Sequence, residues 1–242
     1  MKLLCLNLWG GRVREPLLEF LKQYNDVDIF CFQKIYNNAP FDRGTATQEP
    51  DLQLLTSLRN LLPGYQDYFR PVIEKDFGIA IFIKRGIQVL TEDSAFIYEN
   101  PHYSGKGGDH SRNVQWATIQ DGEKAYHVFN IHALWNGKGK GDAPERIEQS
   151  MRIKKLMSAI SGPKILCGDF NVNPDTQSLH LLENGMINLI KTHGITSTRT
   201  RFYEKEIKFA DYMLVSPDIN VLDFKLLPDE VSDHAPLYLE FE

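Results

Sequence analysis

Polar side chains stand at the ends of several strand-like apolar runs in this sequence. Six of them carry the functional groups of phosphoryl chemistry: Asn7, His132, Asp169, Asn171, Asp211 and His234. Because side chains at strand ends can meet at one edge of a sheet, we expect them to converge. Carboxylates supply oxygen ligands for a cation or a base for water, and amides and imidazoles donate to phosphoryl oxygens. The pattern predicts a site for phosphate-ester chemistry.

Taken one at a time, these residues also have structural explanations. Asn7 and Asn171 are typical of turns, and Asp169 is typical of a helix or loop cap. His132 has the apolar neighbours of a hydrogen-bonded core histidine. Only their joint occurrence, in order along the chain, favours a functional site.

Short apolar runs between amphipathic stretches predict the elements that position these residues. The strand-like runs are Leu3–Leu8, Val27–Phe32, Ile79–Ile83, Tyr126–Ile131, Lys164–Cys167, Ala210–Val215 and Leu237–Phe241. Apolar residues at helical spacing predict helices over residues 17–24, 54–62 and 153–160. Asp142 and Glu145 have the spacing of a capping box, with Pro144 in the first turn, and predict the start of the third helix.

The length of 242 residues, without repeats or a linker, predicts a single domain over residues 1–242. Long polar segments remain at residues 34–49, 99–112, 134–143 and 191–208, and long loops often carry function. The loops over residues 102–112, 134–142 and 191–208 together carry a charge of +5, which leaves −10 for the rest of the chain. A local basic patch on an acidic body is therefore predicted.

Composition narrows the class of protein. With 42% hydrophobic and 24% charged residues and a net charge of −5, the chain is typical of globular proteins. No apolar run approaches the roughly 20 residues of a membrane span, and the first residues are interpreted as a strand instead of a signal peptide. Cys5, Cys31 and Cys167 are expected to be reduced core residues. We expect a cytoplasmic monomer.

Six short motifs, in this order, carry a resemblance that spans nearly the whole chain. They are Leu6-Asn7-Leu8-Trp9, Phe32-Gln33-Lys34, Asn130-Ile131-His132, Gly168-Asp169-Phe170-Asn171, Asp211-Tyr212 and Ser232-Asp233-His234. The set resembles the endonuclease/exonuclease/phosphatase superfamily, whose fold is also called DNase I-like. The resemblance implies a four-layer α/β sandwich, in which helices flank two packed, mainly antiparallel sheets. It also implies a site at one edge of the sandwich.

The resemblance assigns the catalytic roles residue by residue. Asp169 would orient and polarise the attacking water, and Asn171 would hold that water or a phosphate oxygen. His234 would stabilise the pentacoordinate phosphorus and would itself be oriented by Asp211. His132 would donate a hydrogen bond to a non-bridging oxygen.

The same comparison predicts the residues that bind substrate and metal. Asn7 would donate to a non-bridging oxygen, and Arg112, Asn130 and Trp135 are further candidates for substrate binding. Asp233 would help to hold a metal ion, for which the family implies Mg²⁺. Aromatic residues in the loops are candidates for the leaving-group side: Tyr98, His102, Tyr103, Trp135, Phe202 and Tyr203.

The sequence departs from the family pattern at Lys34. The family has a glutamate after the glutamine at the end of the second strand, and that glutamate is its principal metal ligand. Here the pair is Gln33-Lys34, and Trp9 stands where an acidic residue often follows the first asparagine. Like charges a few ångströms apart repel by several kcal/mol at protein-like dielectric, so ordinary Mg²⁺ binding should be weakened.

Three interpretations of Lys34 remain open. In the first, Lys34 is an inactivating substitution. In the second, it points away from the site, while the aspartates and loop acids such as Asp42 or Glu49 retain a looser metal site. In the third, its ammonium occupies the place of the cation. The third interpretation predicts turnover with little or no metal dependence, because a fixed ammonium relieves the repulsion among crowded aspartates.

The predicted function is hydrolysis of a small phosphodiester-type substrate, with triesters or monoesters as further candidates, by in-line attack of water. Long duplex nucleic acid is not expected as a partner, because its binding relies on extensive positive charge. One alternative is a catalytically impaired member of the fold that binds a ligand or regulates. Another is a metal-dependent nuclease that acts on nucleic-acid ends, where a short groove suffices.

Overall fold

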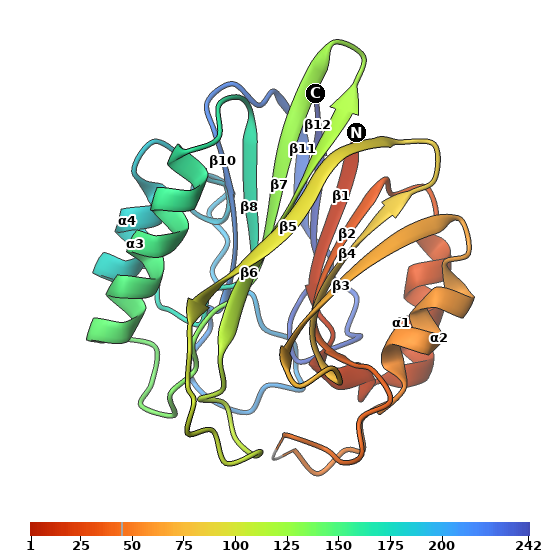
Figure 1. Cartoon of the computed structure of the whole chain (residues 1–242), viewed down its shortest axis with the longest axis vertical. Coiled ribbons are helices and arrows are strands. Elements are labelled where there is room, and N and C mark those ends of the chain that lie inside the picture. Colours follow the sequence, from red (N-terminus) through yellow and green to blue (C-terminus); the bar gives the residue numbers. More distant parts are fainter. Residues whose placement is uncertain (45) are drawn as a thin grey trace.

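Two six-stranded sheets face each other and helices cover their outer sides in the computed structural model, which describes residues 1–44 and 46–242 (Figure 1). The first sheet has the order β11 (Val221–Leu226), β12 (Leu237–Phe241), β1 (Lys2–Asn7), β2 (Ile29–Tyr36), β4 (Phe77–Lys84) and β3 (Tyr65–Ile73). The second has the order β5 (Gln88–Tyr98), β6 (Arg112–Asp121), β7 (Lys124–His132), β8 (Lys164–Asp169), β10 (Asp211–Val215) and β9 (Ile187–Asn188). The predicted four-layer sandwich is confirmed.

Strand pairing in both sheets is mainly antiparallel, as predicted. β1 and β2 are parallel, as are β7 and β8, and the other strand pairs of the described residues are antiparallel. The two parallel pairs lie near the middle of their sheets and place the ends of β1, β2, β7 and β8 at the same edge of the sandwich (Figure 1). This edge therefore collects the residues that follow those four strands.

The three predicted helices are present as α1 (Arg14–Gln23), α2 (Leu54–Leu61) and α3 (Pro144–Ser158). α1 and α2 cover the first sheet, whereas α3 and α4 (Gln177–Glu183) lie on the opposite side of the molecule (Figure 1). α5 (Leu189–Thr192) and a short 3-10 helix η1 (Trp9–Gly11) complete the elements. Leu17, Phe20 and Leu21 of α1 are buried, as the helical spacing requires.

The predicted capping box of the third helix is wrong, although Pro144 does occupy its first turn. The N-cap residue is Ala143, without a side-chain hydrogen bond. Asp142 instead accepts hydrogen bonds from the backbone nitrogens of Gln177 and Ser178, at 2.7 and 2.9 Å, in the first turn of α4. A carboxylate can accept hydrogen bonds from the free amides of any helix N-terminus within reach. Asp142 therefore binds the N-terminus of α4, which is distant in sequence, instead of the start of α3.

The core lies mainly between the sheets and between the first sheet and its helices. Cys5, Cys31 and Cys167 are free and buried in the core between the sheets, and burial raises the pKa of each thiol. The prediction of reduced core cysteines therefore holds. No helix among the described residues is long and apolar enough to cross a membrane.

A polar contact joins the two sheets beneath their shared edge. The Asn130 amide of β7 donates to the carbonyls of Phe32 and Ala80, at 3.2 and 3.1 Å, and its oxygen accepts from Gln33 Nε2 at 2.7 Å. Asn130 and Gln33 are fully buried. These bonds replace the water that the groups lose on burial, so the contact fixes one sheet relative to the other.

We expect Asn130→Ala to lower the free energy of unfolding by about 2–4 kcal/mol, because it leaves buried donors and acceptors unpaired. Urea unfolding of the purified variant measures this loss. Asn25→Ala, at an exposed position, serves as the control and should change stability by less than about 0.5 kcal/mol. Equal stabilities of the two variants would contradict a structural role for the Asn130 amide.

Gly168 generates a second prediction. Its φ is +139°, and a Cβ atom there would lie 2.0 Å from the carbonyl oxygen of Ile131 on the neighbouring strand. Gly168→Ala must shift the backbone just before Asp169, so we expect a stability loss of more than about 2 kcal/mol. Thermal and urea unfolding test it against Gly64→Ala, where a Cβ meets nothing within 4 Å. A loss no larger than that of the control would show that β7 and β8 tolerate a side chain there.

Candidate active site

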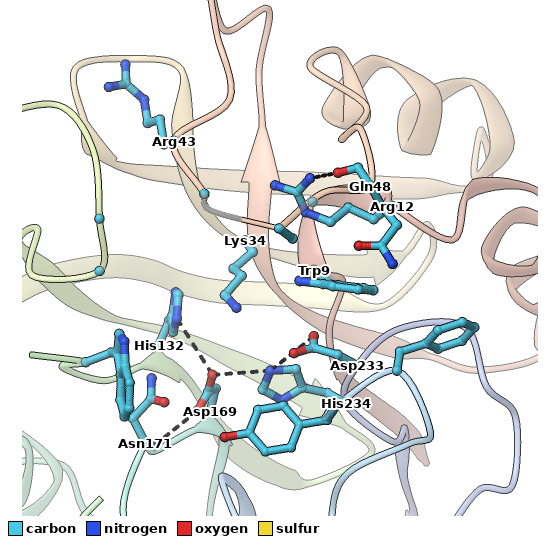
Figure 2. A pocket seen from close by; sticks show the side chains of 18 of the residues that line it. Trp9, Arg12, Lys34, Arg43, Gln48, His132, Asp169, Asn171, Asp233 and His234 are labelled. Carbon is cyan, nitrogen blue, oxygen red and sulfur yellow. Dashed lines mark hydrogen bonds and ion pairs between the residues drawn. The ribbon is translucent and has the colours of Figure 1, made fainter. Parts of the chain in front are cut away.

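A pocket of about 620 Å³ opens at the edge where β1, β2, β7 and β8 end (Figure 2). Its described walls come from Phe77 and from seven further parts of the chain: residues 9–12, 34–44 with 46–48, 107–112, 132–140, 169–171, 199–205 and 233–234. All four loops that the sequence marked as long and polar contribute to it. The basic loops therefore do gather on one face, around the end of the sandwich.

Asp169, at the end of β8, lies at the centre of the site. Its Oδ2 accepts a hydrogen bond from Asn7 Nδ2 at 2.8 Å, and its Oδ1 accepts from the backbone nitrogen of Asn171 at 3.0 Å. Nε2 of His132 and Nε2 of His234 each lie 3.7 Å from Oδ2. Asp169 is 1% exposed, so its orientation is fixed by these neighbours rather than by solvent.

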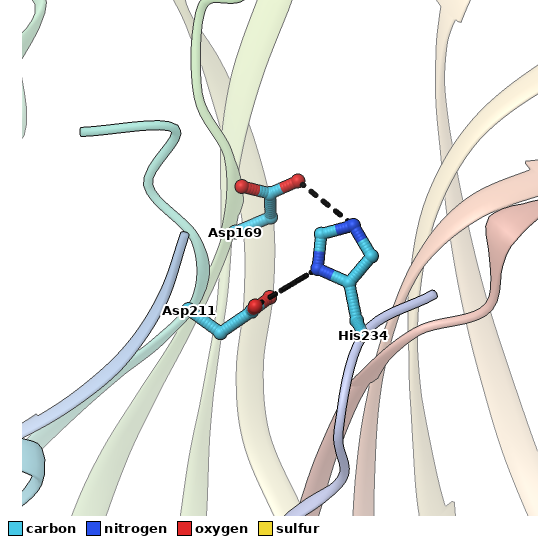
Figure 3. A group of neighbouring side chains, drawn as sticks. All are labelled: Asp169, Asp211 and His234. Carbon is cyan, nitrogen blue, oxygen red and sulfur yellow. Dashed lines mark hydrogen bonds and ion pairs between the residues drawn. The ribbon is translucent and has the colours of Figure 1, made fainter. Parts of the chain in front are cut away.

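His234 forms the expected pair with Asp211 behind the pocket wall (Figure 3). Both Asp211 oxygens lie 2.8 Å from His234 Nδ1, and Thr198 donates to the same carboxylate at 3.1 Å. On the pocket side, Arg199 Nη1 lies 2.7 Å from His234 Nε2. Since a guanidinium only donates, Nε2 must accept, which assigns the proton to Nδ1.

Burial lowers the pKa of both imidazoles in the pocket. For His234 the next cause is the charge of Arg199, and for His132 it is the charge of Arg112; Lys34 contributes to both. Two neutral imidazoles therefore flank the Asp169 carboxylate at neutral pH. In this state each ring offers one N–H donor and one acceptor nitrogen.

Lys34 points into this pocket (Figure 2). It lies at a β-bulge, where the β2–β4 register shifts between Phe32 and Ile35, and its φ of 57° is left-handed. The bulge turns the half-buried side chain toward the side where Asp169 and His132 lie (Figure 2). Among the described residues, no carboxylate forms an ion pair with its ammonium. The interpretation that Lys34 points away from the site is wrong.

Two predicted substrate ligands, Asn130 and Asn7, make contacts within the protein and are not among the residues that line the pocket, whereas Arg112 is. Asn130 joins the sheets, and Asn7 is fully buried with its amide bound to Asp169. Arg112 is 1% exposed and donates to the carbonyl of Gly108, and burial lowers its pKa to about 10. It remains charged at neutral pH and contributes a positive potential beneath His132. The contacts of Asn130 support a structural role because no atom of it reaches the pocket.

Aromatic residues form part of the wall, as the loops suggested. Trp135, Phe202 and Tyr203 line the pocket, and so does Trp9, whose ring centroid is 6.2 Å from that of Phe202. Trp135 packs against the backbone of Gly108, where a Cβ atom would lie 2.3 Å from the indole. The other candidates for the leaving-group side, Tyr98, His102 and Tyr103, are not among the lining residues.

The motifs did not indicate five of the cations that line the pocket, which are Arg12, Arg43, Lys140, Arg199 and Lys205. Two of them are buried, and no carboxylate of the described residues binds either of these two through both oxygens. Lys140 is 2% exposed and Arg199 has a side-chain exposure of 6%. Both belong to loops whose net positive charge was visible in the sequence, but nothing there distinguished them from the exposed Lys138 and Arg201. His110 also lines the pocket, with its ring centroid 6.0 Å from that of His132.

Asp169, Asp211 and His234 offer metal-ligand atoms that lie within 4.8 Å of one another. The donor set does not fit Mg²⁺, however. Asp211 is bound by His234 and Thr198, and Asp233, the predicted ligand, pairs with Arg199 at 3.3 Å. Mg²⁺ demands near-octahedral oxygen ligands, and basic side chains line the same pocket, among them Lys34, Lys140 and Arg199.

The loop acids do not complete a looser metal site either. Both oxygens of Asp42 lie 2.7 Å from Arg12 Nη2, and Tyr36 donates to Oδ1 at 2.7 Å. Glu49 lines a separate, open hollow beside Pro50 and Asp51. That interpretation is wrong for both residues, because one carboxylate is neutralised by an arginine and the other lies outside the pocket.

Comparison with known proteins agrees with this geometry. Solved structures with the same fold include a mannosyl-6-phosphatase, Bt3783, from Bacteroides thetaiotaomicron VPI-5482, which is 21% identical with a TM-score of 0.76 over 100% of this chain and 99% of that one. The human Nocturnin catalytic domain is 17% identical with a TM-score of 0.68, over 100% and 94% of the chains. A humanized D. rerio TDP2 is 14% identical with a TM-score of 0.70, over 100% and 98%.

Among curated proteins, none matches this sequence. The model of the Endonuclease/Exonuclease/phosphatase family, in contrast, matches residues 4–234, which include every motif from the first asparagine to the last histidine. The chain therefore belongs to the Endonuclease/Exonuclease/phosphatase family.

Proposed function

We propose that this protein is a phosphodiesterase that hydrolyses a small substrate by in-line attack of water, with the Lys34 ammonium in the place of a metal cation. One observation carries the proposal: Lys34 points into the pocket that holds Asp169, His132 and His234 (Figure 2). An ammonium there neutralises the carboxylates and is a donor for a phosphoryl oxygen.

The charge of the site favours an anion. Basic side chains outnumber carboxylates among the residues that line the pocket: Arg12, Lys34, Arg43, Arg112, Lys140, Arg199 and Lys205 against Asp169, Glu204 and Asp233. An anionic ligand such as a phosphodiester reduces this excess of positive charge. An added divalent cation would increase it, which is unfavourable in a partly buried space.

In this proposal, each group has one role during hydrolysis, which the contacts of the site support. A water beside Asp169 attacks phosphorus, a new P–O bond forms, and the proton of the water passes to the carboxylate. The opposite P–O ester bond breaks, and the leaving oxygen takes its electron pair and then a proton from solvent at the pocket mouth. Neutral His132 donates to a non-bridging oxygen, while Asp211 holds His234 in one tautomer and orientation.

The substrate is small in this proposal. The pocket volume of about 620 Å³ lies within the range of small-molecule sites, and the chain carries a net charge of −5 that disfavours long duplex nucleic acid. Trp9, Trp135, Phe202 and Tyr203 offer apolar surface for the groups attached to phosphorus. That one relative of the same fold is a mannosyl-6-phosphatase supports phosphate-ester chemistry in general.

Metal removal tests the role of Lys34. We expect wild-type activity on a chromogenic phosphodiester to survive exhaustive chelation, because the cation is part of the chain. Lys34→Met should lose about 10²–10³-fold in kcat, as loss of a preorganised donor to the developing charge typically does. The control Lys75→Met, at an exposed turn, should retain activity.

The converse variant, Lys34→Glu, restores the carboxylate of the family. Its activity should be low without metal and should rise when Mg²⁺ is added. Activity of the wild type that vanishes on chelation and returns with Mg²⁺ would refute the role of Lys34 as the cation.

A variant of His234 tests whether the protein catalyses hydrolysis or only binds its ligand. We expect His234→Ala to reduce kcat/KM on the same ester by about 10²–10⁴-fold, the usual range for removing a group that assists proton transfer or stabilises charge. His180→Ala, at an exposed position on α4, is the matched control. Equal activity of both variants would mean that the signal comes from a contaminant and that the chain only binds its ligand.

A further inference from the structure

Arg199 is placed in the pocket by a backbone contact that the sequence does not reveal. Residues Arg199 and His234 form an isolated antiparallel bridge. It is supported by hydrogen bonds from Ala235 N to Thr198 O at 3.0 Å and from Thr200 N to Asp233 O at 3.4 Å. The bridge fixes the Cα atom of Arg199 directly beside the Ser232-Asp233-His234 motif.

The guanidinium of Arg199 is only partly satisfied there. Its Nη1 lies 2.7 Å from His234 Nε2 and 3.3 Å from one oxygen of Asp233, and its buried Nε has no hydrogen-bond partner among the described residues. Its plane is supported by the Tyr203 ring, whose centroid is 4.0 Å from the Arg199 Cζ atom. Donor capacity thus remains beside the acceptor nitrogen of His234.

Other arginines at the pocket show what a structural ion pair looks like in this protein. Arg43 binds Asp76 through Nε at 3.0 Å and through Nη2, which lies 2.8 and 2.6 Å from the two carboxylate oxygens. Arg12 places Nη2 2.7 Å from both oxygens of Asp42. Each of these arginines therefore engages both oxygens of its carboxylate partner. Arg199 reaches one oxygen of Asp233, through Nη1 alone, and no described group bonds its Nη2, which can donate to a second anion.

Lys140 lies against the same aromatic ring. Its ammonium is 5.9 Å from the Tyr203 centroid and donates to the carbonyl of Phe209 at 2.7 Å, and it forms no ion pair with a carboxylate in the described part of the chain. Burial, and next the charge of Arg199, lower the pKa of Lys140 to about 7. A buried ammonium with one hydrogen bond is destabilised until an anion arrives.

The loop that carries Lys140 is held firmly from α3. Arg146, which is 1% exposed, donates to the carbonyls of Gly139, at 2.7 Å, and of Gly141, the residues on either side of Lys140. The carbonyl of Lys140 itself accepts from Asn173 N at 2.9 Å. The ammonium is therefore preorganised, because the backbone on both sides of it is fixed.

We propose that Arg199 and Lys140 are catalytic residues that bind the non-bridging oxygens of the scissile phosphoryl group, together with Lys34. This inference rests on the proposed function and identifies two catalytic residues that the family motifs do not contain. Charge on the equatorial oxygens must be stabilised as water attacks, and fixed guanidinium and ammonium donors do so without rearrangement. The three cations come from three separate segments of the pocket wall and face one substrate.

Kinetics of six variants test the proposal on a nitrophenyl phosphodiester. Lys140→Met and Arg199→Met should each lose about 10–10³-fold in kcat/KM, whereas their exposed counterparts Lys138→Met and Arg201→Met should stay within about twofold of wild type. Circular dichroism and thermal unfolding establish that the variants are folded. Lys140→Arg and Arg199→Lys keep the charge, and should retain more activity than the methionine variants.

A chemical rescue separates substrate contact from support of the fold. Added methylguanidinium should restore part of the activity of Arg199→Ala and none of the activity of Lys140→Met. A merely structural arginine would show no such rescue. Turnover by Arg199→Met and Lys140→Met within twofold of the two controls would overturn the inference and leave the proposed function intact.

If the wild type turns over no phosphodiester, the proposed function is wrong, but the anion site can still be tested by calorimetry of inorganic phosphate binding. Phosphate binding that is lost in Lys140→Met and Arg199→Met, but kept in Lys138→Met and Arg201→Met, would still support the anion site. Unchanged binding in all four variants would overturn it.

Discussion

The arrangement of the pocket follows from the need to balance three buried carboxylates. Asp169, Asp211 and Asp233 are brought to one edge by strands and a terminal motif, and each is at most 7% exposed. Carboxylates that lie close together and are shielded from solvent repel each other and take up protons unless cations are near. Most members of the family are expected to meet this demand with a metal ion. In the proposed function, side-chain cations supply the compensating charge: Lys34 from the bulge in β2, and Lys140 and Arg199 from loops.

A covalently attached cation needs a rigid support, and the ion pairs around the pocket supply it. Arg43 is bound to Asp76 and Arg12 to Asp42, which holds the segment after β2 against the sheet, and Arg146 holds the loop after β7. Ion pairs in a half-buried setting contribute little net stability when the cost of desolvation is included. Their effect is geometric: each confines a long loop to one conformation, so the charges it carries face the site.

Central strands and amphipathic helices were predictable from the sequence because burial on both faces, or on one helical stripe, dictates their composition. Strands β3, β5, β6 and β11 were not, because they are less continuously apolar and β5 is largely exposed. The motif residues Asp169, Asp211 and His234 do converge. Lys140 and Arg199 could not be predicted, because in the sequence they resemble the exposed Lys138 and Arg201. The backbone bridge to His234 places Arg199 in the pocket, and the hydrogen bonds from Arg146 of α3 fix the loop of Lys140. Both are tertiary contacts.

The conformation of Lys34 connects this charge balance to the backbone. A left-handed residue in a β-bulge costs of order 1 kcal/mol for any side chain other than glycine, asparagine or aspartate. The bulge nonetheless directs the side chain of Lys34 into the pocket. In a regular strand, side chains alternate between the two faces, so a residue after Gln33, which faces the other sheet, would point to the opposite face. A carboxylate at this position would face Asp169 without a counter-charge of its own and would need a metal ion. In the proposed function, a lysine in this backbone brings the counter-charge with it, so the side chain at this one bulge determines whether the cation comes from the chain or from a metal ion.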